Sequence, residues 1–167
     1  VAAAAPFVQM EGMIQSGRDL EPVLVHGVDP EFEAAMSGGI INLVEGSLDS
    51  LQPGSRSIIL GRLLAFDLGV RIGDGVVLLI PRPAGDGTLE PRLERFVLRG
   101  VFEAGLQEHD SVLALMNARD AAGVLGIGDE MSAIRFRAHD VMDAPAVSAA
   151  LQANLGSQVR SEERRVG

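Results

Sequence analysis

The chain of 167 residues contains no cysteine, no tryptophan, no tyrosine and no lysine. The absence of cysteine excludes thiol catalysis, disulfide bonds and metal sites with cysteine ligands. Aromatic residues make up only 4% of the chain, against 47% for all hydrophobic residues, so the core must consist mainly of valine, isoleucine, leucine and alanine. Apart from three histidines, every basic side chain is an arginine.

Positive charge and long apolar runs are also scarce. The formal net charge is −9, so the chain lacks the basic stripe that a nucleic-acid backbone requires, and we expect no nucleic-acid partner. No stretch approaches the roughly 20 apolar residues of a membrane span, and no signal peptide is evident. Because the chain begins at Val1 rather than at a methionine, in a strand-like segment, we interpret it as a fragment of a longer protein.

The central part of the chain, residues 57–103, predicts a frame of strand, helix, strand, long loop and strand. Its elements are a buried strand at Ile58–Leu60, a helix that carries Leu63, Leu64 and Leu68 and ends at Gly69, a strand covered on both sides at Val76–Ile80, and a strand in which Phe96, Leu98, Gly100 and Phe102 share one face.

The flanking segments predict further strands and helices, and their mixed order indicates an α+β fold. The predicted elements are a strand at Ala2–Ile14 with a bulge at Glu11-Gly12, a turn at Ser16–Arg18, a strand at Val23–Val28, a helix that begins at Asp29-Pro30-Glu31, a strand at Ser111–Met116, a helix capped by Asn117 and ended at Gly126, a strand marked by Met131, Ala133, Ile134 and Phe136, and a helix from Asp143-Ala144-Pro145 to Leu155.

The segment Pro81–Pro91 is longer than the two to five residues of a usual hairpin loop. Three prolines stiffen it, and Gly85-Asp86-Gly87 forms its tip. A long, semi-rigid loop on a firm sheet loses little entropy on docking, so the segment suits contact with a partner. On the residues alone, a tolerated surface insertion is the simpler interpretation.

Catalytic and metal-binding patterns are missing from the sequence. His26, His109 and His139 lie far apart, with no pair at the spacing of a helical metal site. No nucleophile-elbow motif occurs, and the glycine-rich Gly123–Gly128 segment follows a helix instead of joining a strand to one. We interpret the acids near Glu103–Asp110 as a solvated rim. No catalytic residue, metal or cofactor is therefore predicted.

Two groups of residues occur in a characteristic order and spacing. The central group is Leu60-Gly61, Leu64-Ala65, Leu68-Gly69-Val70, Ile72-Gly73-Asp74 and Val76. The flanking group is Gly27–Pro30, Val44–Leu48, Leu51, Pro53-Gly54, the Pro81–Pro91 loop, Phe102–Gly105, Glu108 and Asp110. Together they resemble the periplasmic core domain of bacterial MacB/FtsX-type ABC permeases, and within it the LolC/LolE branch, from about Ala5 to about Gly156.

This resemblance implies a two-lobed α+β domain. Residues 1–45 and 141–160 would form a discontinuous α/β lobe called the porter, and residues 46–140 an inserted β-rich lobe called the sabre. Residues 157–167 would be a tail. The resemblance also implies a non-catalytic periplasmic domain, without a cofactor, of a bacterial inner-membrane protein.

The implied parent protein works with a second LolC/LolE-type permease subunit and a LolD-type ATPase. The complex would release outer-membrane-destined lipoproteins from the inner membrane and hand them to a LolA-type periplasmic chaperone. In LolC-like chains, a proline-bounded loop called the hook engages this chaperone. The corresponding residues here are Pro81, Arg82, Pro83, Ala84, Gly85, Asp86, Gly87, Thr88, Leu89, Glu90 and Pro91.

The base of the hook departs from the LolC-like pattern. LolC-like chains carry a basic and polar patch there, at positions occupied in this chain by Val77, Leu93 and Glu94. Arg92 and Arg95 lie one residue away, and we expect them to supply the patch instead. A LolC-like, a LolE-like and a hybrid role all stay open. The alternatives outside this branch are an FtsX- or MacB-like domain in cell-wall hydrolase control or efflux, and a soluble α+β enzyme.

Overall fold

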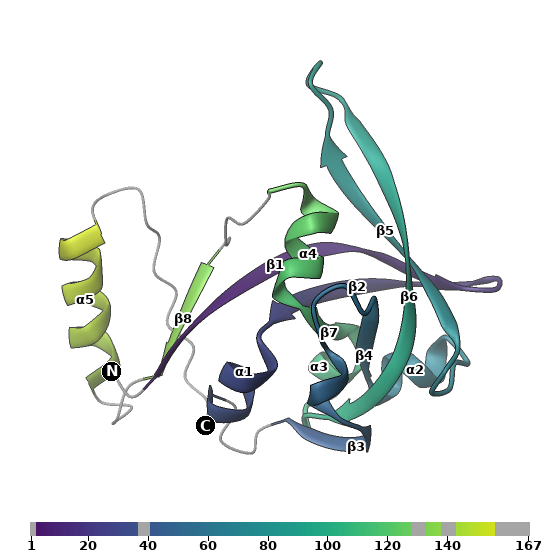
Figure 1. Cartoon of the computed structure of the whole chain (residues 1–167), viewed down its shortest axis with the longest axis horizontal. Coiled ribbons are helices and arrows are strands. Elements are labelled where there is room, and N and C mark those ends of the chain that lie inside the picture. The colour runs from purple at the N-terminus through teal and green to yellow at the C-terminus, as the bar shows by residue number, and fades with distance from the viewer. Residues whose placement is uncertain (1–2, 37–40, 128–132, 138–142, 156–167) are drawn as a thin grey trace.

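The computed structural model describes residues 3–36, 41–127, 133–137 and 143–155, and its fold has the predicted α+β class (Figure 1). The strands are β1 (Ala3–Ser16), β2 (Asp19–Val28), β3 (Asn42–Gly46), β4 (Ser57–Gly61), β5 (Gly75–Pro83), β6 (Leu89–Glu103), β7 (Leu113–Asn117) and β8 (Ala133–Arg137). The helices are α1 (Pro30–Met36), α2 (Arg62–Asp67), α3 (Gln107–Val112), α4 (Ala118–Leu125) and α5 (Ala144–Leu155), with a short 3-10 helix at Leu48–Ser50.

Six of the strands close into a ring. The hydrogen-bonded order is β2-β7-β4-β6-β5-β1, and β1 pairs with β2 as well as with β5, so the path returns to its start. β2–β7 and β4–β6 are parallel, and the other neighbours in the ring are antiparallel. All six strands contribute to one buried cluster, to which α2 adds Leu64 and Ala65 and α4 adds Ala121, Ala122 and Val124.

The predicted boundary between the two lobes, after residue 45, falls inside β3. β1 and β2, which the prediction assigned to the porter lobe, share the ring with β4 to β7. Helix α5 lies at the left end of the molecule, beyond β8, whereas the β5–β6 hairpin projects at the top (Figure 1). The predicted tail lies outside the described residues.

The hairpin of β1 and β2 forms as predicted, with Gly17 in the left-handed conformation (φ 58°) at its turn. The predicted bulge at Glu11-Gly12 is wrong, because Gly12 stands directly opposite Val23 in an unbroken register. The glycine instead allows a close approach of β5: a Cβ atom at Gly12 would lie 2.6 Å from Cδ1 of Ile80.

A bulge where β6 pairs with β4 changes which face of the sheet the β6 side chains occupy. The β4–β6 register shifts between Ile58 and Ile59, which is a bulge on the β6 side. Phe96 and Leu98 pack in the ring's main cluster, whereas Phe102 packs in a second cluster with Ile59. The extra residue reverses the alternation of faces, so the prediction that Phe96, Leu98 and Phe102 share one face is wrong.

The helix ends follow local capping chemistry. The backbone N–H of Glu31 donates to Oδ1 of Asp29 at 3.0 Å at the start of α1, as predicted. The side chain of Asn117 accepts from the backbone N–H of Arg119 at 2.9 Å at the start of α4. Gly126 ends α4 in the left-handed conformation (φ 72°), which a glycine adopts without steric penalty. These helix signals are confirmed.

Two predictions near α3 are wrong, since Ser111 and Val112 end α3 instead of opening β7, and Asp110 is not part of a solvated acidic rim. Asp110 is only 6% exposed, and its Oδ1 accepts the backbone N–H of Ala104 at 2.6 Å. Its backbone packs against Gly61, where a Cβ atom would lie 2.9 Å from the Cα of Asp110. Helix α3, which the sequence did not predict, therefore packs closely against the end of β4.

Candidate docking site

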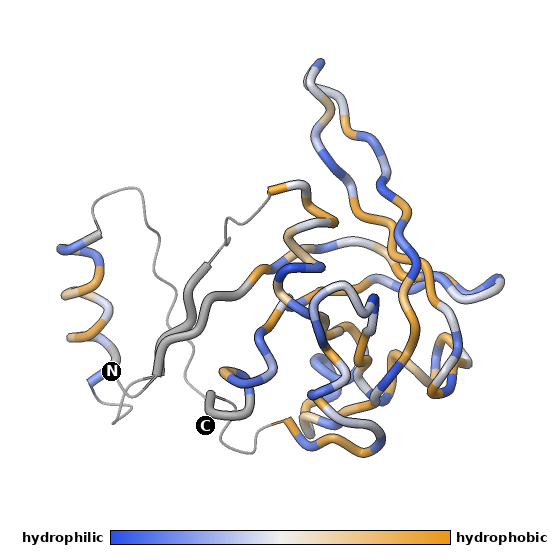
Figure 2. Tube along the Cα trace, in the orientation of Figure 1, coloured by the Kyte–Doolittle hydropathy of each residue, from blue (hydrophilic) through white to orange (hydrophobic). Residues whose placement is uncertain are grey.

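The most distinctive surface feature is a two-stranded arm formed by the ends of β5 and β6. Residues 77–79 of β5 pair with β1, and β6 pairs with β4 from residue 97 onward. Between these points, residues 80–83 of β5 and 89–96 of β6 pair only with each other's strand. The base of this hairpin, at Ile80 and Phe96, is buried in the main cluster, and its far part projects from the body as an arm (Figure 1). Apolar segments continue along the arm, well above the body (Figure 2).

The predicted long loop is therefore mostly strand. The register continues through Pro81↔Pro91 to Pro83↔Leu89, and only residues 84–88 form the turn. The residues from Gly85 to Pro91 are all exposed to solvent. Prolines favour a loop in the sequence, but the positions of these prolines in the strand ladder are compatible with strands.

The prolines occupy positions that need no ladder hydrogen bond. The backbone N–H of Ala84 donates to the carbonyl oxygen of Thr88 at 2.7 Å, so this pair is a hydrogen-bonded one. Hydrogen-bonded and non-hydrogen-bonded pairs alternate, which makes Pro81↔Pro91 a non-hydrogen-bonded pair whose backbone nitrogens face outward. Since Pro81 and Pro83 have no N–H, the β5 edge of the arm offers no donor there to an added strand.

The tip of the arm is a hydrogen-bonded turn. Oδ1 of Asp86 accepts both the backbone N–H and the hydroxyl of Thr88, at 2.9 and 2.6 Å. The hydrogen bond from the Thr88 side chain is the main reason that the pKa of Asp86 lies below its usual value. Gly87 supplies the left-handed residue (φ 85°) that the turn requires. The tip is thus an ordered turn with an acidic side chain.

One face of the arm is apolar. Leu89 is 69% exposed and Leu93 is 62% exposed, and the two-residue period of a strand places both on the same face. Their cross-strand neighbours Pro83 and Leu79 extend this face on β5. We call Leu79, Pro81, Pro83, Leu89, Pro91 and Leu93 the outer apolar face. A single exposed leucine is ordinary, but an aligned set on a projecting arm is typical of a docking surface.

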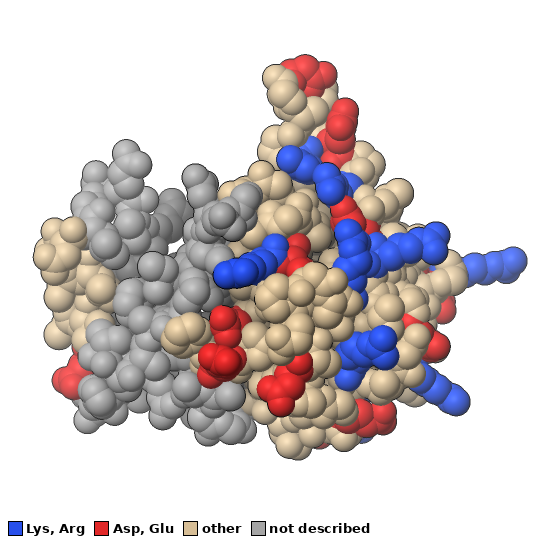
Figure 3. Space-filling view, in the orientation of Figure 1, with Lys and Arg blue, Asp and Glu red and all other residues tan. Residues whose placement is uncertain are grey.

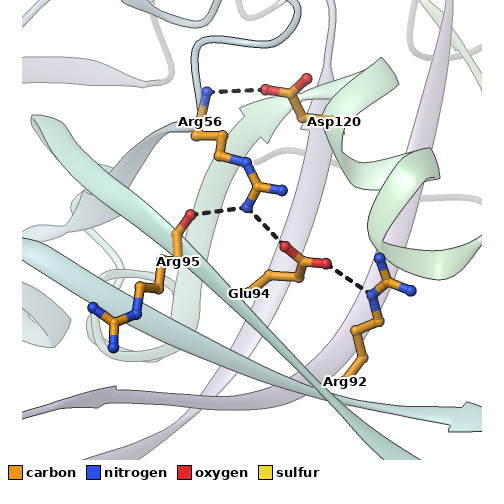
Figure 4. A network of polar contacts seen from close by, with 5 residues as sticks. All are labelled: Arg56, Arg92, Glu94, Arg95 and Asp120. Carbon is orange, nitrogen blue, oxygen red and sulfur yellow. Dashed lines mark hydrogen bonds and ion pairs between the residues drawn. The ribbon is translucent and has the colours of Figure 1, made fainter.

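The other face of the arm is charged and turned toward α4. Oε2 of Glu94 accepts from Nη1 of Arg56 at 2.7 Å, and its Oε1 accepts from Nε of Arg92 at 2.8 Å (Figure 4). The hydrogen bond from Arg56, followed by that from Arg92, holds the pKa of Glu94 below its usual value. Arginines gather around the base of the arm in the space-filling view (Figure 3).

The two arginines that the sequence predicted as one patch lie on opposite faces of β6. Arg92 shares the inner face with Glu94, whereas Arg95 alternates with it and lies beside Leu93 on the outer face. Val77, at one of the positions where LolC-like chains are basic or polar, pairs with Arg95. Only Arg95 therefore extends the outer apolar face with a positive charge.

Sequence reasoning missed Arg56 and Asp120. Arg56 belongs to the turn before β4, and Asp120 belongs to α4, yet the backbone N–H of Arg56 donates to Oδ2 of Asp120 at 3.3 Å. These residues are 64 positions apart, and no local pattern in the sequence links them. Only the tertiary structure brings them to the base of the arm.

The histidines give no sign of a metal centre in the described parts of the chain. His26 is buried in β2, and His109 lies in α3. His139 lies outside the described residues. Within those residues, no group of three or more histidine, aspartate or glutamate side chains is arranged to hold a metal ion.

Replacement of Gly126 by alanine is expected to destabilise the fold by about 1–2 kcal/mol, because Gly126 has φ 72° and a side chain there is strained. The new Cβ would also collide with the guanidinium of Arg82 on the arm, which already lies against Gly126. Urea unfolding measures the loss. Gly123→Ala is the matched control, since a Cβ at this helical position meets open space and should stabilise by about 0.5–1 kcal/mol. Equal effects of the two substitutions would contradict the prediction.

The chain belongs to the family described as the MacB-like periplasmic core domain, whose model matches residues 1–154. This places it in a class of domains from ABC-type transporters. Within the described residues, no helix has the length and apolarity needed to cross a bilayer.

Relatives and a solved structure narrow the comparison. The chain is 36% identical to the lipoprotein-releasing system transmembrane protein LolC of Xylella fastidiosa (strain Temecula1) over 157 residues. This alignment covers 93% of the chain and 37% of the relative. The chain is also 30% identical over 155 residues to LolC of Neisseria meningitidis serogroup B (strain MC58), covering 90% of this chain and 37% of the relative. The chain thus spans little more than a third of these proteins.

A solved structure supports the fold alone. The extracellular domain of the noncanonic ABC-type transporter YknZ from Gram-positive bacteria aligns with a TM-score of 0.60 over 93% of this chain and 76% of that domain. The sequence identity is only 12%.

Proposed function

We propose that this chain is the non-catalytic periplasmic domain of a LolC/LolE-type permease and that it hands lipoproteins to a LolA-type chaperone. In this proposal the parent complex contains a second permease subunit and a LolD-type ATPase, and it extracts outer-membrane-destined lipoproteins from the inner membrane. The hook, residues 81–91, docks the chaperone. The similarity to LolC proteins over nine-tenths of the chain supports the assignment.

The projecting arm with its outer apolar face is the observation that carries the proposal. Leu89 and Leu93 are large apolar side chains held in solvent on a two-stranded support. Such residues raise the free energy of the isolated domain's surface and become favourable when a partner desolvates them. The outer apolar face would be complementary to an apolar, concave surface on the chaperone.

The proline pattern favours recognition by side chains over strand addition. Because Pro81 and Pro83 remove the outward donors of the β5 edge, a partner strand would find no N–H partners there. The outer apolar face then supplies most of the binding energy. Arg95, exposed at the lower end of that face, steers the encounter as a rim charge, and Arg92 acts from the inner face.

The two-lobed organisation belongs to the same proposal. Residues 1–45 and 141–160 form the porter lobe next to the membrane, and residues 46–140 form the sabre lobe that carries the hook. ATP-driven movements of the complex reach the hook through this body.

Titration of a LolA-type chaperone into the purified domain tests the proposal. Saturable binding is expected, and the double substitution Leu89→Ser and Leu93→Ser should weaken it at least tenfold, because two desolvated anchors are lost. The control is Leu20→Ser, which changes a 47% exposed leucine on the β1–β2 hairpin and should leave the affinity unchanged. Calorimetry measures all three affinities. Equal loss in the control and the double variant would show that the arm has no special role.

A further inference from the structure

Arg56 has an unusual backbone conformation for its residue type. Its φ is 51°, and among the described residues it is the one non-glycine with positive φ. This left-handed region is unfavourable for a residue with a long side chain, since the Cβ atom crowds the backbone. Such a conformation persists only where the surroundings hold it in place, and it often marks a functional position.

Three backbone contacts hold the turn that contains Arg56. The backbone N–H groups of Gly54 and Arg56 donate to the two carboxylate oxygens of Asp120, at 2.7 and 3.3 Å. The carbonyl oxygen of Arg56 accepts the backbone N–H of Val97 at 2.9 Å. The turn is thereby tied both to α4, through Asp120, and to β6 at the point where the arm leaves the ring.

The side chain of Arg56 contacts the arm itself. Its Nη1 donates to Oε2 of Glu94 and also to the carbonyl oxygen of Arg95, at 2.7 and 3.2 Å. The guanidinium carbon lies 5.7 Å from the centre of the Phe96 ring, which is within the range of a cation–π contact. Glu94 is largely shielded, with a side chain only 12% exposed (Figure 4). Arg56 therefore touches three consecutive residues of β6.

A free two-stranded hairpin is marginally stable and bends easily, so the direction of the arm depends on what supports its base. The contacts at the base come from Arg56 on the β6 side and from Arg82, which lies against Gly126 at the end of α4, on the β5 side. Both lead to the same helix. These contacts fix the angle between the arm and α4. They leave the outer apolar face exposed to a partner.

We propose that Arg56, Glu94 and Asp120 form a clamp that fixes the angle of the arm relative to α4, with Arg56 as its positioning residue. The clamp makes the arm and the ring move as one rigid body. A displacement of the ring therefore displaces the tip of the arm equally, because the arm does not bend at its base. It also pre-organises the arm for docking, which lowers the entropy lost on binding. This inference concerns the domain alone and holds whichever partner the arm meets.

Distances between spin labels at the tip and on the body test the clamp. Because the chain has no cysteine, Thr88→Cys at the tip and Asp67→Cys on α2 give two specific labelling sites. The clamp variants are Arg56→Asn, which suits the left-handed conformation but lacks the guanidinium, and Glu94→Gln. Each should at least double the width of the tip-to-body distance distribution. Arg95→Gln, on the opposite face of β6, is the matched control and should leave the width unchanged.

The thermal midpoint checks that the variants stay folded. Little change is expected, since the side chains of Arg56 and Arg92 are 56% and 42% exposed and pairs of this kind contribute little to stability. If a clamp variant fails to fold, Arg56→Gln replaces it, because a glutamine is shorter, carries no charge and lacks the guanidinium that donates to Glu94 and to the Arg95 carbonyl. A distance distribution as narrow as that of the unsubstituted domain in any folded clamp variant would overturn the proposal.

Discussion

Replacement of Asp86–Leu89 by a Gly/Ser turn of the same length is expected to weaken binding of a LolA-type chaperone at least tenfold. The change removes Leu89, an apolar side chain that is 69% exposed at the end of the arm, and a single desolvated anchor often contributes about 2 kcal/mol or more to a small interface. It also removes the hydrogen bonds between Asp86 and Thr88 that order the tip. Calorimetric titration measures the affinity.

The melting temperature should stay unchanged in this variant, because none of the four residues is buried. A Gly/Ser replacement of Ser16–Asp19, the turn of the β1–β2 hairpin, is the control, since it alters a second exposed turn away from the arm. If the arm variant binds the chaperone as tightly as the original domain does, or if the chaperone does not bind at all, the chain is better assigned to a LolE-like role that faces the lipoprotein.

Replacement of Phe102 by alanine is expected to destabilise the fold by about 3–5 kcal/mol, the usual range for a phenylalanine truncated in a core. Phe102 is fully buried and packs with Ile59, Leu51 and Leu115 in the second cluster. The surrounding strands are held by the ring, so the cavity would collapse only in part. Unfolding in urea gives the change in free energy.

Phe66→Ala provides the matched control for this prediction. The ring of Phe66, on α2, is 81% exposed, so the same chemical change should alter the free energy of unfolding by no more than about 0.5 kcal/mol. A loss at Phe102 as small as that at Phe66 would contradict the assignment of Phe102 to a core. It would also remove the support for the bulge that turns Phe102 away from Phe96.

The two faces of the arm are suited to different roles, the outer face to binding a partner and the inner face to holding the arm in position. The outer apolar face, with Leu89 and Leu93, is left free in the isolated domain and is suited to a partner. The inner face carries Glu94, whose carboxylate is occupied by Arg56 and Arg92 and is unavailable to an external cation. A substitution on one face should therefore change affinity, and a substitution on the other should change the direction of the arm.

The sequence by itself determined the elements whose signals are local. Asp29 at the start of α1, Asn117 at the start of α4 and Gly126 at its end act through contacts within one turn of helix, so composition and spacing are sufficient to predict them. The apolar run Ile58–Leu60 is buried from both sides, as its composition indicates. The prolines and glycines after Ile80 were sufficient to indicate a surface segment there.

Tertiary structure decided the features that depend on residues far apart in the chain. The bulge in β6 follows from its pairing with β4, and it sends Phe102 to a different cluster from Phe96 although the sequence alternates regularly through both. Helix α3 was not predicted, and it packs with the backbone of Asp110 against Gly61, a contact between residues 49 positions apart. The contact between Arg56 and Asp120 joins a turn to a helix 64 residues later. Local patterns carry no information on such contacts, because their free energy arises only once the ring has closed.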